Sequence, residues 1–460
     1  MDNNRHNHYI EFRNKYPKFV YSGYKISETD QSLGLDFHFA IIGLAEFKTH
    51  WEMAKPSSYS VDFNDKRLGG LVFSLGMVEL ASYWKMTCSP EVHIACGTLS
   101  EEQSAWWKKL YKKGLGEFFY TNGIDIDEDF MCIADQKIDY CAPDENTIGD
   151  SDARVLIPVG GGKDSAVTLE LLRGHAERLC YMINPRKAML KTASVGSIPN
   201  EKIIIANRAL DENMLALNKQ GFLNGHTPFS ALVAFSSTIA AYIHGIKFIA
   251  LSNESSANES TVLGSDVNHQ YSKSFEFESD FIAYEGRHIA SGVKYFSLLR
   301  PFTELGIARI FSRLEGYHPI FRSCNAGSKR DIWCASCPKC LFVYIILSPF
   351  LPENEMASIF GRNMLDDPGL KPIFDKLIGL RPEKPFECVG SRDEVNAALY
   401  ELICQYESDG IALPELVGYY KGLGIENKFS ILEMCGSYDG DNNVPEQFTK
   451  AIQNEYIMGM

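Results

Sequence analysis

Residues 155–172 read VLIPVGGGKDSAVTLELL, and this stretch decides the fold of the chain. The apolar run Val155–Val159 predicts a buried strand, and Asp164–Arg173 predicts a helix that begins almost directly after it. Three consecutive glycines between them allow a tight turn and a close approach of the backbone to an anion. The amides of such a turn and the positive N-terminal end of the helix favour a phosphate group.

The polar side chains of the same turn support a phosphate-binding loop. Lys163 adds positive charge, Asp164 can bind Mg²⁺, and Ser165 can donate a hydrogen bond to a phosphate oxygen. The spacing matches neither the Walker loop, GxxxxGK[ST], nor the dinucleotide motif GxGxxG. The predicted phosphate-binding residues are Gly160, Gly161, Gly162, Lys163, Asp164 and Ser165.

The segments after this loop alternate between strand and helix. Leu179–Ile183, Lys202–Ala206 and Phe248–Leu251 are apolar runs typical of strands, whereas Thr227–Ile243 opens with Thr-Pro, a frequent start of a helix. This alternation predicts an α/β fold with a parallel sheet and helices on both of its faces.

Residues 1–150 are expected to form a separate N-terminal α+β domain. Lys18–Ile26 and Leu33–Glu46 alternate in part like strands with one buried face, and Asp65–Trp84 has apolar residues at helical spacing. Ser100 and Gln103 predict a capping box before a helix over residues 105–115.

A polar segment, Asp139–Ala153, predicts the linker to the second domain. Residues 151–350 are then expected to form the nucleotide-binding domain with the late cysteines, and residues 351–460 a helical C-terminal region.

Four cysteines late in the chain follow the spacing C-x9-C-x2-C-x2-C. They are Cys324, Cys334, Cys337 and Cys340. Two C-x2-C steps place three thiolates on one tight turn, and the first cysteine can complete a tetrahedron around a structural Zn²⁺. An iron–sulfur cluster and unliganded reduced cysteines are the alternatives.

A long polar segment follows the strand that ends near Leu251. Ligands of open α/β sheets lie beyond the carboxyl ends of the strands, so Glu254 is placed to face a nucleotide or substrate. Further along, Asn268–Lys273 gathers donors and proton carriers, although a solvated surface loop would have the same composition. The motif Asn224–Pro228 is equally consistent with a simple helix cap. The candidate catalytic residues are Glu254, His269, Tyr271 and Lys273.

Composition narrows the class of partner. The formal net charge of −14 repels a polyphosphate backbone, so a nucleic acid is not expected as a partner.

The hydrophobic segments bear on the location of the protein. The longest apolar run, about residues 341–351, is too short for a membrane span. The polar start MDNNRHNHYI lacks the apolar core of a signal peptide, so we expect a cytoplasmic protein with reduced cysteines. Oligomeric state is left open.

The glycine turn resembles the SGGxDS loop of the ATP pyrophosphatase (PP-loop) superfamily, with Gly160 in place of the first serine. In that superfamily the loop after the second strand lies near adenine and ribose, which implies a nucleotide contact at Asn184. The 7-cyano-7-deazaguanine synthases of this superfamily have a similar cysteine cluster, which favours Zn²⁺.

Several segments together resemble the ATP-dependent UDP-N-acetylmuramoyl-L-alanyl-L-glutamate epimerases, bacterial enzymes of peptidoglycan precursor synthesis. The segments are PVGGGKDS (158–165), GFLNGHTPFSAL (221–232), LSNESSAN (251–258), VNHQYSKSFEFE (267–278), WCASCPKC (333–340) and KPFECVG (384–390).

This resemblance implies a reaction and its cofactors. ATP and Mg²⁺ would convert a carboxyl group of a UDP-linked muramoyl dipeptide into an acyl adenylate, with release of diphosphate and later of AMP. The anhydride makes the neighbouring Cα–H acidic enough for a protein base, and a second donor returns a proton to the opposite face.

Other functions share the same motifs. A nucleobase- or tRNA-modifying PP-loop enzyme fits the loop and the cysteines, and so does a non-catalytic ATP-binding protein. A cysteine pair is a second known route for proton transfer in amino-acid racemases, and Cys388 could belong to one, although a buried structural role is the alternative.

Overall fold

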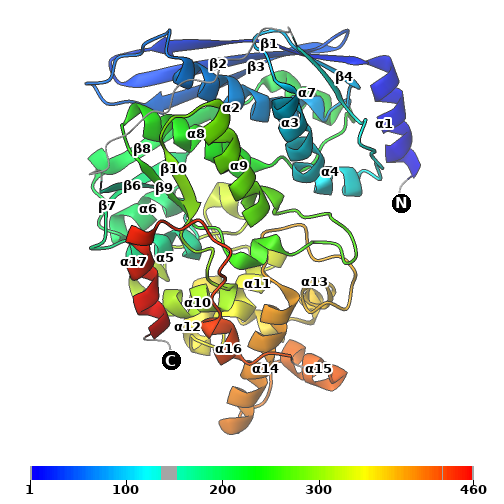
Figure 1. Cartoon of the computed structure of the whole chain (residues 1–460). Coiled ribbons are helices and arrows are strands. Elements are labelled where there is room, and N and C mark those ends of the chain that lie inside the picture. Colours follow the sequence, from blue (N-terminus) through cyan, green and yellow to red (C-terminus); the bar gives the residue numbers. More distant parts are fainter. Residues whose placement is uncertain (1–2, 136–152, 427, 458–460) are drawn as a thin grey trace.

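The computed structural model describes residues 3–135, 153–426 and 428–457 (Figure 1). Ten strands in these residues form one sheet with the order β10-β9-β6-β7-β8-β3-β2-β1-β4-β5. The strands are β1 (Lys18–Glu28), β2 (Ser32–Ile41), β3 (Ala45–Ala54), β4 (Glu91–Ile94), β5 (Cys132–Asp135), β6 (Arg154–Pro158), β7 (Glu177–Ile183), β8 (Ile203–Ala209), β9 (Phe248–Leu251) and β10 (Lys294–Ser297).

The five strands β10-β9-β6-β7-β8 are parallel, which confirms the predicted α/β fold. Helices α5 (Lys163–Leu171), α6 (Lys187–Val195) and α8 (Phe229–Ile243) lie in the connections between them. The chain order of the strands reverses between β6 and β9. A ligand site is expected at the carboxyl ends of the strands beside this reversal.

The parallel strands separate two hydrophobic cores. Leu156 of β6 points into one core, and its neighbours Val155 and Ile157 point into the other. Both faces of the strand are therefore buried, which explains why its sequence is apolar throughout rather than alternating.

The first two strands have the one buried face that was predicted, but the predicted run Leu33–Glu46 contains most of β2, a turn and the start of β3. Leu35, Phe37 and Phe39 of β2 are buried, whereas His38 between them is exposed. Strand β3 pairs antiparallel with β8 and thereby joins the N-terminal strands to the parallel strands. The predicted linker falls mainly on residues 136–152, which lie outside the described residues, so the division into three domains stays a prediction.

The helices of the N-terminal half cover the sheet beside these strands (Figure 1). Asp65 caps α2, and Ser100 with Gln103 forms the predicted capping box, although the helix begins at Glu101 rather than at residue 105. The helices not yet given in this half are α1 (Asn3–Lys15), α2 (Lys66–Trp84), α3 (Glu101–Gly114), α4 (Gly116–Thr121), α7 (Glu212–Lys219) and α9 (Phe275–His288).

Helix α9 lies where a continuous polar loop was expected after β9. Ser274 caps it by accepting a hydrogen bond from the amide of Phe277. Phe277, Phe281 and Tyr284 recur at helical spacing and are buried, so the segment is an amphipathic helix. The charged residues between them made the segment resemble a polar loop. Only the first part of the expected loop remains outside regular helices, apart from two short 3₁₀ turns, Ser255–Asn258 and Tyr271–Lys273.

The C-terminal region is helical, as expected, and packs below the parallel strands in the view of Figure 1. Its apolar side chains complete the second core, which also contains Val155 and Ile157. No helix in the described part of the chain is both long and apolar enough to cross a bilayer. Two helices, α10 (Glu304–Ser312) and α11 (Pro338–Leu347), precede residue 351. The helices of the predicted C-terminal region are α12 (Glu353–Phe360), α13 (Lys371–Leu377), α14 (Arg392–Ser408), α15 (Glu415–Leu423), α16 (Ile431–Gly436) and α17 (Glu446–Ile457).

Candidate functional site

The glycine turn lies at the carboxyl end of β6, beside the reversal of strand order. Gly161 has a φ of +83°, and a Cβ atom there would lie 3.1 Å from the backbone nitrogen of Met189, so only glycine fits. Gly162 begins α5 without a side-chain cap, which leaves the first amides of the helix free of such a partner. A Cβ atom at Gly160 would meet open space, so the serine of the similar loops would fit there.

Lys163 and Asp164 are adjacent in sequence but lie in different environments. The side chain of Lys163 is 2% exposed and forms ion pairs with Asp164 and Glu304, whereas that of Asp164 is 27% exposed. Burial alone would raise the pKa of Asp164, but Lys163, Lys339 and Lys273 lower it overall. An ionised, accessible carboxylate at the glycine turn suits Mg²⁺, while Lys163 supports the turn from below.

Glu254 follows β9 at the same edge of the sheet. Its side chain is buried, and its Oε2 atom has no hydrogen-bond partner among the described residues. Arg300 is completely buried and donates hydrogen bonds to the carbonyl oxygens of Glu254, at 2.6 Å, and of Lys273, at 2.5 Å. This arginine therefore fixes the two loops that hold the candidate catalytic residues.

Lys273 and His269 both lie beside the thiol of Cys388. Lys273 also lies close enough to Asp164 and Glu254 for both carboxylates to raise its pKa. Burial alone would raise the pKa of Cys388, but Lys273 and His269 lower it to about 6. The glycine turn, the loop after β9 and the Cys388 loop thus enclose one charged cluster.

A glutamate of the N-terminal half extends this cluster. Glu117 of α4 is hydrogen-bonded to Nδ1 of His269, and the same carboxylate oxygen lies 3.6 Å from Nδ1 of His226. Burial lowers the pKa of His269, but the bonds to Cys388 and Glu117 raise it to about 9. Burial, His269 and Lys85 lower the pKa of His226 to about 3.

Tyr271 and Asn184, two other predicted residues, lie outside this cluster. The hydroxyl group of Tyr271 is directed to Asp280, and burial raises the pKa of this hydroxyl above its usual value. Asn184 is exposed and has a φ of +46°; its side chain bonds both the amide and the carbonyl group of Arg208. Neither side chain reaches the other candidates in this conformation.

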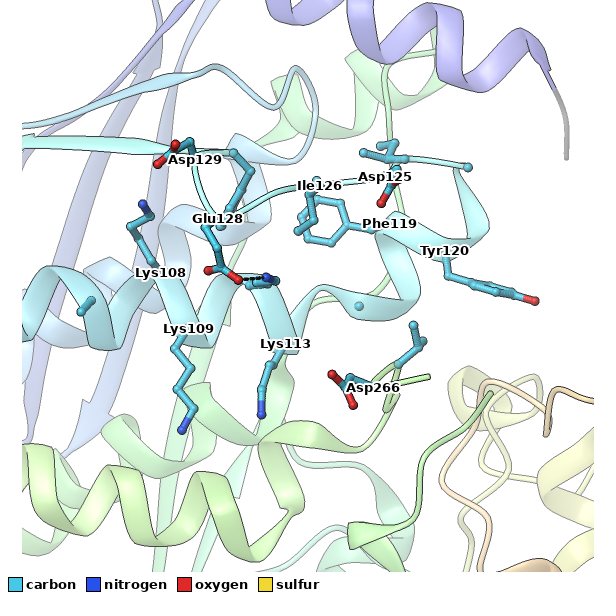
Figure 2. Close-up of a pocket in the computed structure, with 17 residues that line it drawn as sticks. Lys108, Lys109, Lys113, Phe119, Tyr120, Asp125, Ile126, Glu128, Asp129 and Asp266 are labelled. Carbon is cyan, nitrogen blue, oxygen red and sulfur yellow. Dashed lines mark hydrogen bonds and ion pairs between the residues drawn. The ribbon is translucent and has the colours of Figure 1, made fainter. Parts of the chain in front are cut away.

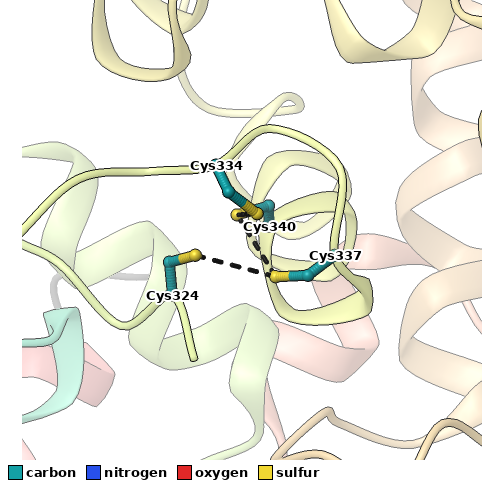
Figure 3. A group of neighbouring side chains, drawn as sticks. All are labelled: Cys324, Cys334, Cys337 and Cys340. Carbon is teal, nitrogen blue, oxygen red and sulfur yellow. Dashed lines mark hydrogen bonds between the residues drawn. The ribbon is translucent and has the colours of Figure 1, made fainter. Parts of the chain in front are cut away.

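The four late cysteines converge as their spacing predicts (Figure 3). The Sγ–Sγ distances are 3.8 Å for Cys324–Cys337, 3.7 Å for Cys334–Cys340 and 3.5 Å for Cys337–Cys340. Four sulfurs bound to Zn²⁺ at ~2.3 Å would stand ~3.8 Å apart in a regular tetrahedron. The geometry fits a single Zn²⁺ better than a larger iron–sulfur cluster.

Lys339 links the cysteine cluster to the Cys388 loop. It stands between two of the cysteines at the start of α11, and its amide donates to Glu387 at 2.8 Å. Its ammonium group is hydrogen-bonded to the carbonyl oxygen of Cys388. The cysteine turn therefore helps to hold the loop that presents the thiol.

A groove of about 940 Å³ opens next to the charged cluster that contains Glu117 and His269 (Figure 2). Gly116 and Val267 line it, and each lies within two residues of a member of the cluster. The ring of Tyr120 lies at the rim, 5.4 Å from the ring of Phe386 in the Cys388 loop. Four lysines of α3 also line the groove, at positions Lys108, Lys109, Lys112 and Lys113.

The fold, together with the residues at the carboxyl edge of its parallel strands, defines a class of protein. It is an α/β protein with a glycine-rich turn of the anion-binding type and a buried set of proton-carrying groups beside this turn. The family model described as the MurL N-terminal domain matches residues 11–298, and the MurL C-terminal domain matches residues 320–414. The chain belongs to the MurL family of epimerases.

Three similar proteins are each named UDP-N-acetyl-alpha-D-muramoyl-L-alanyl-L-glutamate epimerase. The protein of Xanthomonas oryzae pv. oryzae is 35% identical over 72% of this chain and 74% of its own length. That of Salinispora tropica is 34% identical over 75% of each chain. That of a Micromonospora species is 33% identical over 75% of this chain and 77% of its own. No solved structure matches this chain.

Four residues of the site were not predicted from sequence. Glu117, Arg300, Glu304 and Lys339 stand in separate helices or turns, and none belongs to a motif that indicates its role. Only Lys339 carried a local signal, because it lies between the cysteines of WCASCPKC.

Proposed function

We propose that this epimerase uses ATP to activate a carboxyl group of UDP-N-acetylmuramoyl-L-alanyl-L-glutamate as an acyl adenylate and then inverts the glutamate Cα. The proposal is supported mainly by the position of Asp164, where the glycine turn meets the charged cluster. This carboxylate belongs to the glycine turn, and it also lies in the charged cluster that contains Lys273 and Glu254. Activation and proton transfer can therefore take place on one bound glutamate.

Adenylation is assigned to the glycine turn. The amides at the start of α5 would bind the phosphates that leave as diphosphate, and Asp164 would hold Mg²⁺. Mg²⁺ would offset charge on the phosphates when the carboxylate oxygen attacks the α-phosphorus. Lys163 acts from beneath the turn, where its ion pairs with Asp164 and Glu304 orient the metal-binding carboxylate.

Proton transfer is assigned to the buried cluster. The activated carboxyl group no longer carries a negative charge, so electrons left by the Cα proton can delocalise into the acyl group. Glu254, His269 and Lys273 lie at the same edge of the sheet as Asp164 and are the proposed proton-carrying and charge-stabilising groups. Tyr271 would have to leave Asp280 to take part, so it is the weakest of the predicted four.

The cysteine cluster is assigned a structural Zn²⁺. Four thiolate ligands close the coordination sphere, so this metal would stabilise the fold and take no part in the reaction. Its position beside Lys339 gives it an indirect role, because Lys339 holds the Cys388 loop.

The groove of Figure 2 is the proposed place for the UDP-sugar part of the substrate. The groove borders the charged cluster through Gly116 and Val267, so the dipeptide attached to the sugar could extend directly into the site. Its volume lies in the range common for small-molecule sites, ~300–1,000 Å³.

The proposal is tested by product analysis with ATP, Mg²⁺ and the L-Glu substrate. We expect one AMP and one diphosphate released with formation of the D-Glu product, and little AMP without substrate. A tRNA- or nucleobase-modifying enzyme would leave the glutamate configuration unchanged, and a non-catalytic ATP-binding protein would leave ATP intact. Inversion without ATP, or with ADP as the product, would contradict the adenylate mechanism.

A further inference from the structure

Cys388 occupies a position that the proposed function does not explain. Cys388 as a residue is only partly buried, in contrast to the nearby Lys163 and Glu304. Its thiol lies beside the side chains of His269 and Lys273. Two cationic groups beside one sulfur are more than packing requires.

The imidazole of His269 lies between a carboxylate and the thiol. Glu117 is hydrogen-bonded to Nδ1, and Cys388 is the other polar neighbour that raises the pKa of this imidazole. A carboxylate, an imidazole and a thiol joined in this order hold the imidazole protonated and the sulfur ionised. The three residues come from α4, from the turn before Tyr271 and from the loop after α13, so only the folded chain brings them together.

We propose that the thiolate of Cys388 is the base that removes the Cα proton on one face of the activated glutamate, with His269 and Glu117 as its positioning residues. This inference rests on the proposed function. The Cα–H bond breaks, its electron pair enters the acyl group of the adenylate, and the proton forms an S–H bond with Cys388. A second protein acid returns a proton to the opposite face, and Glu254 is the candidate. After product release, the thiol loses its proton to solvent and the acid regains one, which restores both groups.

The surroundings of the sulfur support an ionised thiol near neutral pH. Lys273 and His269 contact it, and the ammonium group of Lys339 lies behind its carbonyl group, whereas Glu387 is the nearby acid. Burial raises the pKa of Glu387, and its carboxylate accepts a hydrogen bond from the amide of Lys339, 2.8 Å long.

Glu117, His226 and His269 also have their ligand atoms within 4.8 Å of one another, a spacing that could hold a metal ion. A metal ligand must be deprotonated, however, and the bonds of His269 to Cys388 and Glu117 raise its pKa to about 9. The protonated imidazole that orients a thiolate and the neutral imidazole that binds a metal are mutually exclusive. We therefore assign these groups to Cys388.

The first test separates activation from inversion in Cys388→Ser. The substitution changes one atom in a partly exposed loop, and Cys404→Ser, at an exposed position of α14, is the matched control. We expect Cys388→Ser to keep substrate-dependent exchange of labelled diphosphate into ATP and to lose at least 100-fold in inversion and in deuterium uptake at Cα from D₂O. Inversion within threefold of the wild type would overturn the inference and leave the proposed function standing. Loss of diphosphate exchange in the wild type would instead refute the proposed function.

The second test uses the wild-type protein and does not depend on a variant that folds. The rate of alkylation of Cys388 by iodoacetamide, followed by peptide mass spectrometry, reports the fraction of thiolate. We expect it to rise with pH around a midpoint near 6, because the pKa of this thiol is lowered to about 6. In Glu117→Gln the imidazole loses its ionised partner, so the midpoint should move upward, and the acid limb of the inversion rate should move with it. A wild-type midpoint above ~8, close to an ordinary thiol, would overturn the inference.

Discussion

The cluster of four late cysteines and the single thiol of Cys388 have the same chemistry but opposite surroundings. Cys324, Cys334, Cys337 and Cys340 face one another within residues 324–340, whereas Cys388 faces His269 and Lys273. The first group suits a metal that neutralises several thiolates, and the second suits one thiolate held by cations. On the proposed assignments, the neighbours of a cysteine, more than its exposure, decide whether it supports the fold or moves a proton.

The largest effect is expected from Asp164→Ala, which removes the carboxylate to which we assign a part in both activation and inversion. Loss of metal and charge stabilisation at the phosphates should lower AMP formation by roughly 10³-fold, as for other electrostatic groups in active sites. Inversion should fall by the same factor. Asp30→Ala, on the exposed turn between β1 and β2, is the control, and both products are measured in one assay.

This variant also tests the comparison of the thiol groups. Asp164→Ala should stop both reactions, and Cys388→Ser should stop only inversion. If Asp164→Ala inverted glutamate at the wild-type rate, the link between the glycine turn and the cluster would be wrong.

The next effect concerns the structural thiols. Cys337→Ser removes one of the four proposed metal ligands, and we expect loss of one bound Zn²⁺ per chain and of more than about 4 kcal/mol of unfolding free energy. Metal content by mass spectrometry and urea unfolding provide the measurements. Cys388→Ser should keep the metal content and the unfolding free energy of the wild type. If both variants lost the metal and the stability equally, the proposed difference between Cys388 and the four clustered cysteines would be wrong.

A smaller change is expected from Lys163→Met, which leaves Glu304 buried without its cation. Breaking a buried ion pair of this kind costs ~3–5 kcal/mol. Lys421→Met, which breaks the exposed pair with Glu407, should cost less than ~1 kcal/mol. Urea unfolding compares the two. A stable Lys163→Met with a strongly raised KM for ATP would show that Lys163 contacts phosphate rather than Glu304.

The smallest effect is expected from Ser100→Ala in the capping box of α3. Loss of the hydrogen bond from the amide of Gln103, 3.1 Å long, should cost ~1 kcal/mol and leave both reactions unchanged. Thermal unfolding detects this difference. A loss of activity would mean that α3 contributes to the site beyond lining the groove.

The features predicted correctly from sequence are local. The glycine turn, the four strands β6, β7, β8 and β9, the capping box and the convergence of the four cysteines depend on residues close together in the chain. Spacing and periodicity record such arrangements directly.

The features that sequence did not reveal depend on contacts between distant segments. Glu117 and His269 are brought together by the packing of α4 against the loop before α9, and Cys388 joins them from the C-terminal region. The pairing of β3 with β8 is equally distant, and it places the N-terminal strands in the same sheet as β6, which leads into the glycine turn. No periodic pattern marks these pairs, because each needs the whole fold.

The central claim, that the carboxyl group of glutamate attacks the α-phosphorus of ATP, is tested most directly by oxygen transfer. The L-Glu substrate is labelled with ¹⁸O in the glutamate α-carboxyl group and converted with ATP. Water then attacks the acyl carbon of the adenylate, so the bridging oxygen leaves with AMP. We expect one ¹⁸O atom in each AMP, detected by mass spectrometry. Complete inversion with unlabelled AMP would contradict it.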